Sequence, residues 1–170
     1  MTTETYHWGN DPAFKTSGIV VLNQDHEVMW SKVMDFSIEG FSKTLDCLPI
    51  EKFPPKTIVF ERFVSYGPAT TKFSEYILMG LGATMDRTRM AEQFFFRAID
   101  WKTALVKREF REKQYVNPSK TLDKKFSKSM AFHLTGHIFK TDHEADAACL
   151  AAIGIRSDYS LKPAPFETSD

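Results

Sequence analysis

Short apolar runs separated by polar turns dominate the first third of the chain. Residues 17–22 (SGIVVL) and 27–35 (EVMWSKVMD) are rich in β-branched and apolar side chains, and residues 23–26 (NQDH) between them suit a tight turn. We therefore predict a β-hairpin. Residues 6–11 precede it as a further strand, and Pro12 is expected to interrupt the strand ladder there.

Helical and strand-like segments alternate after this meander. Ser37 suits an N-cap and is followed by apolar residues at helical spacing, which predicts a helix of about three turns (Ile38, Phe41, Leu45 and Leu48). Residues 57–63 (TIVFERF) are strand-like and contain Glu61. A second amphipathic pattern starts at Thr70 and predicts a longer helix (Phe73, Ile77, Leu81 and Met85).

The following segments predict one more strand and two helices. Residues 93–99 (QFFFRAI) form a short aromatic strand, and Asp100 is expected to cap a helix that begins at Trp101. A further helix is predicted from residues 117–119 onward, because apolar residues recur there at every fourth position (Leu122, Phe126 and Met130).

The last helix has the clearest start signal. Residues 141–144 (TDHE) have the form of a capping box, in which Thr141 and Glu144 bond to each other's backbone amides. Small residues follow at helical spacing, so this helix is expected to pack tightly (Ala145, Ala148, Cys149 and Ala152).

This order of elements predicts an α/β domain with a mixed five-stranded sheet, an antiparallel N-terminal meander continued by strands that helical crossovers reach. Residues 1–155 are expected to form one domain, and residues 156–170 a disordered C-terminal tail, since that segment combines two prolines with scattered polar residues.

Composition adds little to this prediction, but the distribution of charge adds more. The chain of 170 residues has a formal net charge of zero and 42% hydrophobic residues, as is ordinary for a soluble domain. It has no run of about 18 apolar residues and no secretory signal, so we expect a cytoplasmic protein that does not contact membranes. Cys47 and Cys149 are expected to be small buried residues rather than part of a disulfide framework or a zinc site.

Basic residues concentrate in one segment. Residues 101–128 contain nine Lys and Arg against three Asp and Glu, whereas the first 61 residues contain five against nine. We interpret the segment as a phosphate-binding face, and exposed lysines that serve only solubility are the alternative. The candidate DNA-binding residues are Lys102, Lys107, Arg108, Arg111, Lys113, Lys120, Lys124, Lys125 and Lys128.

Acidic residues and one histidine form the candidate catalytic set. Glu61 lies among apolar neighbours, where an unpaired charge is costly, unless it faces solvent on an edge strand. Asp11 lies where a strand meets a turn, and its alternative role is to bond nearby backbone amides. His143 and Asp146 are three residues apart on one helix face, with Asp142 one turn before Asp146, although a first-turn histidine is more commonly a surface residue.

Together these residues suit phosphodiester cleavage. Nucleases that use two hard cations about 3.5–4 Å apart hold them with carboxylates. Acids from two strands and a helix N-terminus would form such a cage, and a histidine there could bind metal or transfer protons near neutral pH.

The chain also resembles the RuvC-type Holliday junction resolvases of the RNase H-like superfamily, from Gly9 to about Gly154. Four motifs carry the resemblance: residues 10–18 (NDPAFKTSG), 58–63 (IVFERF), 97–105 (RAIDWKTAL) and 143–147 (HEADA). They are similar, in order, to the opening Asp-Pro motif, the central strand with its catalytic Glu, the short strand followed by a helix, and the closing acidic helix. Ala13 departs from the pattern, because the family usually has glycine there.

The resemblance implies an RNase H-like fold and a magnesium-dependent endonuclease that cleaves four-way junctions and related branched DNA in recombination and repair. Catalytic and metal-binding roles are implied for Asp11, Glu61, Asp146 and His143, with two Mg²⁺ ions per site that Mn²⁺ can replace. Asp142 falls outside the pattern. Tyr66 is a candidate to stack on unpaired bases, whereas core packing is favoured for Phe63.

Symmetric cutting of a junction implies a homodimer, and the compact chain suggests a phage or viral member acting in the host cytoplasm. Two alternatives stay open. One is a less selective RNase H-like nuclease for other branched DNA or for RNA, and the other is a nucleic-acid-binding module without catalysis.

Overall fold

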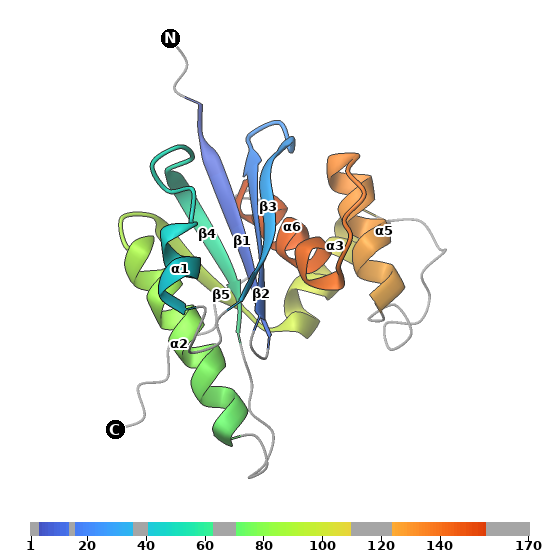
Figure 1. Ribbon diagram of the computed structural model, residues 1–170. Helices are drawn as coiled ribbons and strands as arrows, with labels where there is room; N and C mark the ends of the chain where they lie inside the picture. Colours follow the sequence, from blue (N-terminus) through green and yellow to red (C-terminus); the bar gives the residue numbers. More distant parts are fainter. Residues whose placement is uncertain (1–3, 14–15, 36–40, 63–70, 110–123, 156–170) are drawn as a thin grey trace.

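The computed structural model describes residues 4–13, 16–35, 41–62, 71–109 and 124–155, which form one sheet with helices on both faces (Figure 1). The strands are β1 (Tyr6–Pro12), β2 (Thr16–Asn23), β3 (Val28–Asp35), β4 (Pro55–Glu61) and β5 (Glu92–Phe96). The helices are α1 (Phe41–Asp46), α2 (Thr71–Arg87), α3 (Ala98–Glu109), α5 (Lys124–Thr135) and α6 (Asp142–Ile155).

The five strands lie in the order β3-β2-β1-β4-β5. Strands β1, β2 and β3 form an antiparallel meander, and β4 and β5 join it parallel to β1. This confirms the predicted mixed sheet with its antiparallel N-terminal meander. The strand that carries Glu61 lies between β1 and β5, so it is not an edge strand.

The turn between β2 and β3 shows how local chemistry fixes the hairpin. Asn23 Oδ1 accepts hydrogen bonds from the backbone amides of Asp25 and Glu27, both at 3.0 Å. His26 adopts a positive φ of 65° in this turn. The asparagine side chain thus satisfies amides that the strand ladder leaves unpaired, as the polar sequence of this segment predicts.

Helices α1 and α2 cover one face of the sheet, and α3, α5 and α6 cover the other (Figure 1). The first face carries a core around Trp8, Ile58 and Phe60. The second carries a larger core in which Val20 and Val59 of the sheet meet Trp101 and the alanine-rich helix α6. Alternate residues of the buried strands therefore contribute to the two cores.

Helix α6 lies directly on the sheet backbone at two glycines. A Cβ atom at Gly9 of β1 would lie only 1.8 Å from the carbonyl oxygen of Ala147, and one at Gly18 of β2 only 2.1 Å from the carbonyl oxygen of His143. Both distances are far below van der Waals contact, so no other residue fits unless α6 moves. The tight packing that the small residues of this helix predict is confirmed.

The predicted capping box at the start of α6 is also present. Thr141 Oγ1 accepts from the Glu144 amide at 3.1 Å, and Glu144 Oε2 accepts from the Thr141 amide at 3.2 Å. The second carboxylate oxygen of Glu144 accepts from the Ser31 hydroxyl of β3 at 2.8 Å. The first turn of α6 is therefore fixed both internally and to the sheet.

One predicted helix start differs from the structure. Helix α3 begins at Ala98 rather than Trp101, and Asp100 is not its cap but pairs with Arg97 through two hydrogen bonds of 2.7 and 2.9 Å. The aromatic strand accordingly ends at Phe96. The described part of helix α1 runs from Phe41 to Asp46, and the predicted start of this helix at Ser37 lies outside the described residues.

The remaining sequence predictions have mixed outcomes. Cys149 is buried as expected, but Cys47 is exposed in the turn that follows α1. The start of the helix predicted near residue 117 and the C-terminal tail 156–170 lie outside the described residues. Within the part of the chain that the structure describes, no helix has the length and apolarity needed to cross a membrane.

The contact between α6 and β1 can be tested by filling it. We expect Gly9→Ala to reduce the free energy of unfolding by about 3 kcal/mol or more, because backbone must shift to admit a methyl group. The measurement is urea unfolding followed by circular dichroism. Gly82→Ala in α2 is the matched control: no atom lies within 4 Å of the added methyl, and alanine favours a helix, so stability should be unchanged or slightly raised. Equal effects of the two substitutions would contradict the described packing.

Candidate metal centre

Strands β1 and β4 bring the first two acids together. They are parallel neighbours, and Asn10 of β1 pairs with Phe60 of β4. The next residue on each strand is acidic, Asp11 and Glu61, so the two carboxylates leave the sheet side by side at its carboxyl edge. Both point to the face that α6 covers, as Val59 does two residues before Glu61.

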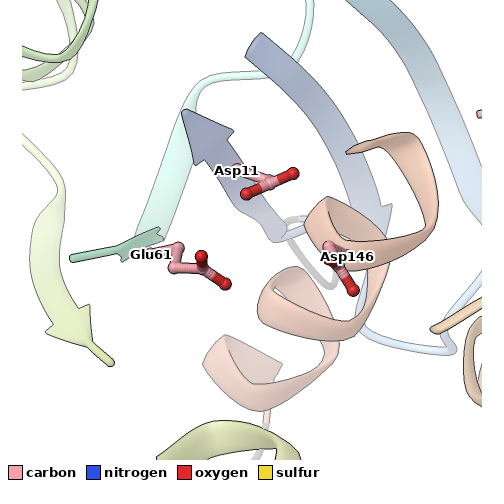
Figure 2. A group of neighbouring side chains, drawn as sticks. All are labelled: Asp11, Glu61 and Asp146. Carbon is pink, nitrogen blue, oxygen red and sulfur yellow. The ribbon is translucent and has the colours of Figure 1, made fainter. Parts of the chain in front are cut away.

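Helix α6 supplies the third acid. Carboxylate oxygens of Asp11, Glu61 and Asp146 all lie within 4.8 Å of one another. Among the described residues, this is the group of three or more His, Cys, Asp or Glu side chains whose geometry could hold a metal ion. Figure 2 shows the three side chains converging from two strands and a helix. Residues separated by up to 135 positions in the sequence thus form one site.

His143 joins this group through Asp11. Its Nδ1 atom is hydrogen bonded to Asp11 Oδ2 at 2.7 Å, and its ring is 42% exposed, so one side of the imidazole faces solvent. The contact depends on Gly18, which pairs with Asp11 in the β1–β2 ladder and whose missing side chain leaves room for the His143 backbone. The pKa of His143 is raised, first by the hydrogen bond to Asp11 and then by the charge of that carboxylate.

The first turn of α3 contributes two contacts that the sequence analysis missed. Trp101 Nε1 donates a hydrogen bond of 2.9 Å to Glu61 Oε2, and Lys102 Nζ lies 3.2 Å from Asp146 Oδ2. The Lys102 ammonium also lies 4.9 Å from the centre of the Trp101 ring, in cation–π geometry. Only the adjacency of Trp and Lys at this helix start could have indicated them, and that signal is weak.

The acids repel one another in a site that is buried or partly buried. Burial raises the pKa of Glu61 to about 7, with the charge of Asp11 as the next cause. Burial also raises the pKa of Asp11, against the opposing effect of the His143 hydrogen bond. Asp11 and Glu61 are therefore costly to ionise without a compensating cation.

A divalent cation fits this centre. Asp146 Oδ1 is buried and has no hydrogen-bond partner, which is an expensive state for a carboxylate oxygen. Three converging carboxylates are the ligand set that hard cations such as Mg²⁺ and Mn²⁺ prefer. A bound cation would satisfy the unpaired oxygen and offset the mutual repulsion of the acids.

The other candidate residues are placed differently. Asp142 is outside the acidic group and forms an ion pair of 3.5 Å with Lys128, whose ammonium also donates to the Lys140 carbonyl oxygen. Lys102 was predicted as a DNA contact, and the structure places its ammonium inside the acidic centre. Four basic residues lie on described helices, but their side chains are not described (Lys107, Arg108, Lys124 and Lys125). Tyr66, Arg111, Lys113 and Lys120 lie outside the described residues.

The sheet order, the mixed strand directions and the helices on both faces define an RNase H-like fold, as the sequence resemblance implies. Two solved structures of RuvC from Thermus thermophilus share it. One, in complex with a Holliday junction substrate, has a TM-score of 0.63 and 15% identity over 87% of this chain and 90% of that chain. The other has a TM-score of 0.62 and 15% identity over 87% and 92% of the two chains.

A third neighbour is the yeast mitochondrial Holliday junction resolvase Ydc2, with a TM-score of 0.49 and 14% identity over 87% and 76% of the two chains. Comparison of the sequence with protein-family models gave no match, and comparison with curated proteins also gave none. At these identities the likeness to the two Thermus structures shows the fold alone.

The repulsion within the centre predicts an unusual effect of removing a charge. Glu61→Gln keeps an oxygen that accepts from Trp101 but cannot ionise, so at pH 8 in chelator it should raise the free energy of unfolding by about 1–3 kcal/mol. Since the folded pKa of Glu61 is raised, folding takes up a proton between about pH 4.5 and 7, and wild-type stability falls as pH rises through that window. The gain should therefore vanish near pH 5.

The measurement is denaturant unfolding of both proteins at several pH values in chelator. Glu92→Gln on β5 is the control, because Glu92 is an exposed glutamate outside the acidic group, and this change should have little effect at any pH. A loss of stability in Glu61→Gln at pH 8 would contradict the repulsive centre.

Proposed function

We propose that this protein is a metal-dependent DNA endonuclease that recognises branched structure and hydrolyses phosphodiesters at four-way junctions. The observation that carries the proposal is the convergence of Asp11, Glu61 and Asp146 within 4.8 Å, at the carboxyl edge of an RNase H-like sheet. The fold of a protein whose structure includes a Holliday junction substrate supports the choice of DNA.

The three acids would hold the cations, two Mg²⁺ ions per site in our proposal, with Mn²⁺ as an effective substitute. Bound cations of this kind activate water and stabilise the leaving oxygen of a phosphodiester. Asp146 offers a buried oxygen with no other partner, and Trp101 holds Glu61 in the orientation that faces the other two acids.

His143 is suited to proton transfer in this reaction. Its Nδ1 atom is held by Asp11, and its other ring nitrogen lies on a partly exposed ring at the border of the centre. A histidine whose pKa is raised above its ordinary value can donate a proton near neutral pH. We propose that it exchanges a proton with the reacting phosphodiester or with water, or completes the metal site.

The substrate would be held by the basic segment of residues 101–128. Its excess of Lys and Arg would make DNA affinity fall steeply with salt. Tyr66 remains our candidate for stacking on an unpaired base. Since resolution of a symmetric junction needs two paired cuts, the active form in this proposal is a homodimer.

Two other functions use the same site or fold. A less selective nuclease would cut linear duplex or RNA as fast as the junction, and a binding module without catalysis would bind and never cut. The unpaired oxygen of Asp146 disfavours the second, because a module that needs no cation would gain stability from a neutral side chain there.

Cleavage of a labelled synthetic four-way junction tests the proposal. Wild type, Asp146→Asn and Glu61→Gln would each be assayed with Mg²⁺, with Mn²⁺ and with chelator, beside a linear duplex and an RNA–DNA hybrid of the same sequence. We expect paired symmetric nicks by wild type with either metal. We expect a loss of at least about 10³-fold in rate in both variants, because each removes a charge from the metal centre.

Junction binding, measured by gel shift, controls for folding. Both variants should bind the junction about as tightly as wild type. Equal cutting of linear duplex and junction would favour the less selective nuclease, and binding without cutting by wild type under every metal condition would contradict a catalytic role.

A further inference from the structure

Lys102 is the basic side chain that the structure places inside the acidic centre. Its ammonium is 3.2 Å from Asp146 Oδ2, and the two side chains are only 11% and 15% exposed. An ion pair this secluded from water is hardly screened, unlike a surface pair. Lys102 is therefore already paired inside the protein, unlike an exposed lysine that is available to bind DNA.

The influence of this ammonium extends over the whole group. The charge of Lys102 opposes the rise in the pKa of Asp11 and of Glu61 as well as pairing with Asp146. One positive charge thus acts on three carboxylates that lie within 4.8 Å of one another. The ammonium of Lys102 thus offsets the same negative charges that a bound metal ion would offset.

The arrangement also offers the ammonium a second contact. Lys102 Nζ is 4.9 Å from the centre of the Trp101 ring, and the Trp101 indole is fixed by its hydrogen bond to Glu61. If Lys102 releases Asp146, the cation–π contact with this buried ring still restrains it. Asp146 Oδ1 has no hydrogen-bond partner, and Lys102 pairs only with Oδ2. A cation that binds both oxygens of Asp146 would therefore interact with this carboxylate more strongly than Lys102 does.

We propose that Lys102 is a resident cation which neutralises the acidic centre of the metal-free protein, and that a divalent cation displaces its ammonium from Asp146. The inference rests on the metal centre of the proposed function, but it concerns the metal-free state and the competition for Asp146. Lys102 is thereby a positioning residue: in the metal-free protein it reduces the repulsion between the three carboxylates and so keeps them close together.

Lys102→Met tests this, because methionine keeps an apolar stem against Trp101 and removes the charge. In chelator at pH 8, Asp146 loses its partner, so the midpoint of thermal unfolding should fall by about 5 °C. The variant also lacks the ammonium that competes with Mn²⁺ for Asp146. The dissociation constant for Mn²⁺, measured by calorimetry, should therefore decrease by about tenfold. Stability and metal affinity should thus change in opposite directions.

Two further variants separate charge from other effects. Lys128→Met removes the same charge from an exposed ion pair with Asp142, one helical turn from Asp146, and should change neither quantity appreciably. Lys102→Arg keeps the charge, so its Mn²⁺ affinity should stay near that of wild type. A similar gain of affinity in Lys102→Met and Lys128→Met would show a general field effect and overturn the proposal.

The outcomes also separate this inference from the proposed nuclease. Suppose that the wild-type protein binds Mn²⁺ and cuts junctions, but that Lys102→Met binds Mn²⁺ no more tightly than wild type does. That result overturns the displacement of Lys102 and leaves the proposed nuclease standing. Tighter binding by Lys102→Met, together with a wild type that never cuts, supports the displacement and removes the nuclease. If wild type binds no Mn²⁺ at all, both fail.

Discussion

The contact between helix α6 and the backbone of the sheet is the constraint on which the site depends. At Gly9 and Gly18 no side chain separates the two layers, so the helix lies about one methyl group closer to the strands than an alanine would allow. That closeness brings Asp146 into range of the strand acids and His143 into contact with Asp11. The capping box and the bond from Ser31 then fix the start of the helix. The close packing of α6 on the two glycines beside the site thus decides how its side chains are placed.

Electrostatics opposes what this packing achieves. Three carboxylates are held together with limited access to water, and one buried oxygen has no partner, so the centre reduces the stability of the fold that contains it. Trp101 and Lys102 relieve part of this cost from the first turn of α3, through one hydrogen bond and one ion pair. Because the carboxylates repel one another in the metal-free protein, a bound cation would stabilise the fold by removing that repulsion. This stabilisation would favour cation binding even without a rigid preformed cage.

The sequence predicts the elements better than the contacts between them. Alternation and turn chemistry identify the strands, and the capping box locates α6, because these signals are local. The acidic set could be predicted as well, since a carboxylate in an apolar strand is conspicuous. The roles of Trp101 and Lys102 could not, because their partners lie 40 and 44 residues away and nothing in a helix pattern specifies a distant partner. Asp100 was wrongly predicted as a helix cap for a different, local reason: the helix begins earlier, at Ala98, and Asp100 bonds to Arg97 three residues before it.

Anomalous scattering from manganese in crystals of the wild-type protein would test the central claim, that the acidic centre holds divalent cations, most directly. Data collected at the manganese absorption edge should show a peak about 2.1 Å from oxygens of Asp11, Glu61 and Asp146, with Asp146 Oδ1 among the ligands. An empty centre at saturating Mn²⁺, with Asp146 Oδ1 still unpaired, would contradict the account.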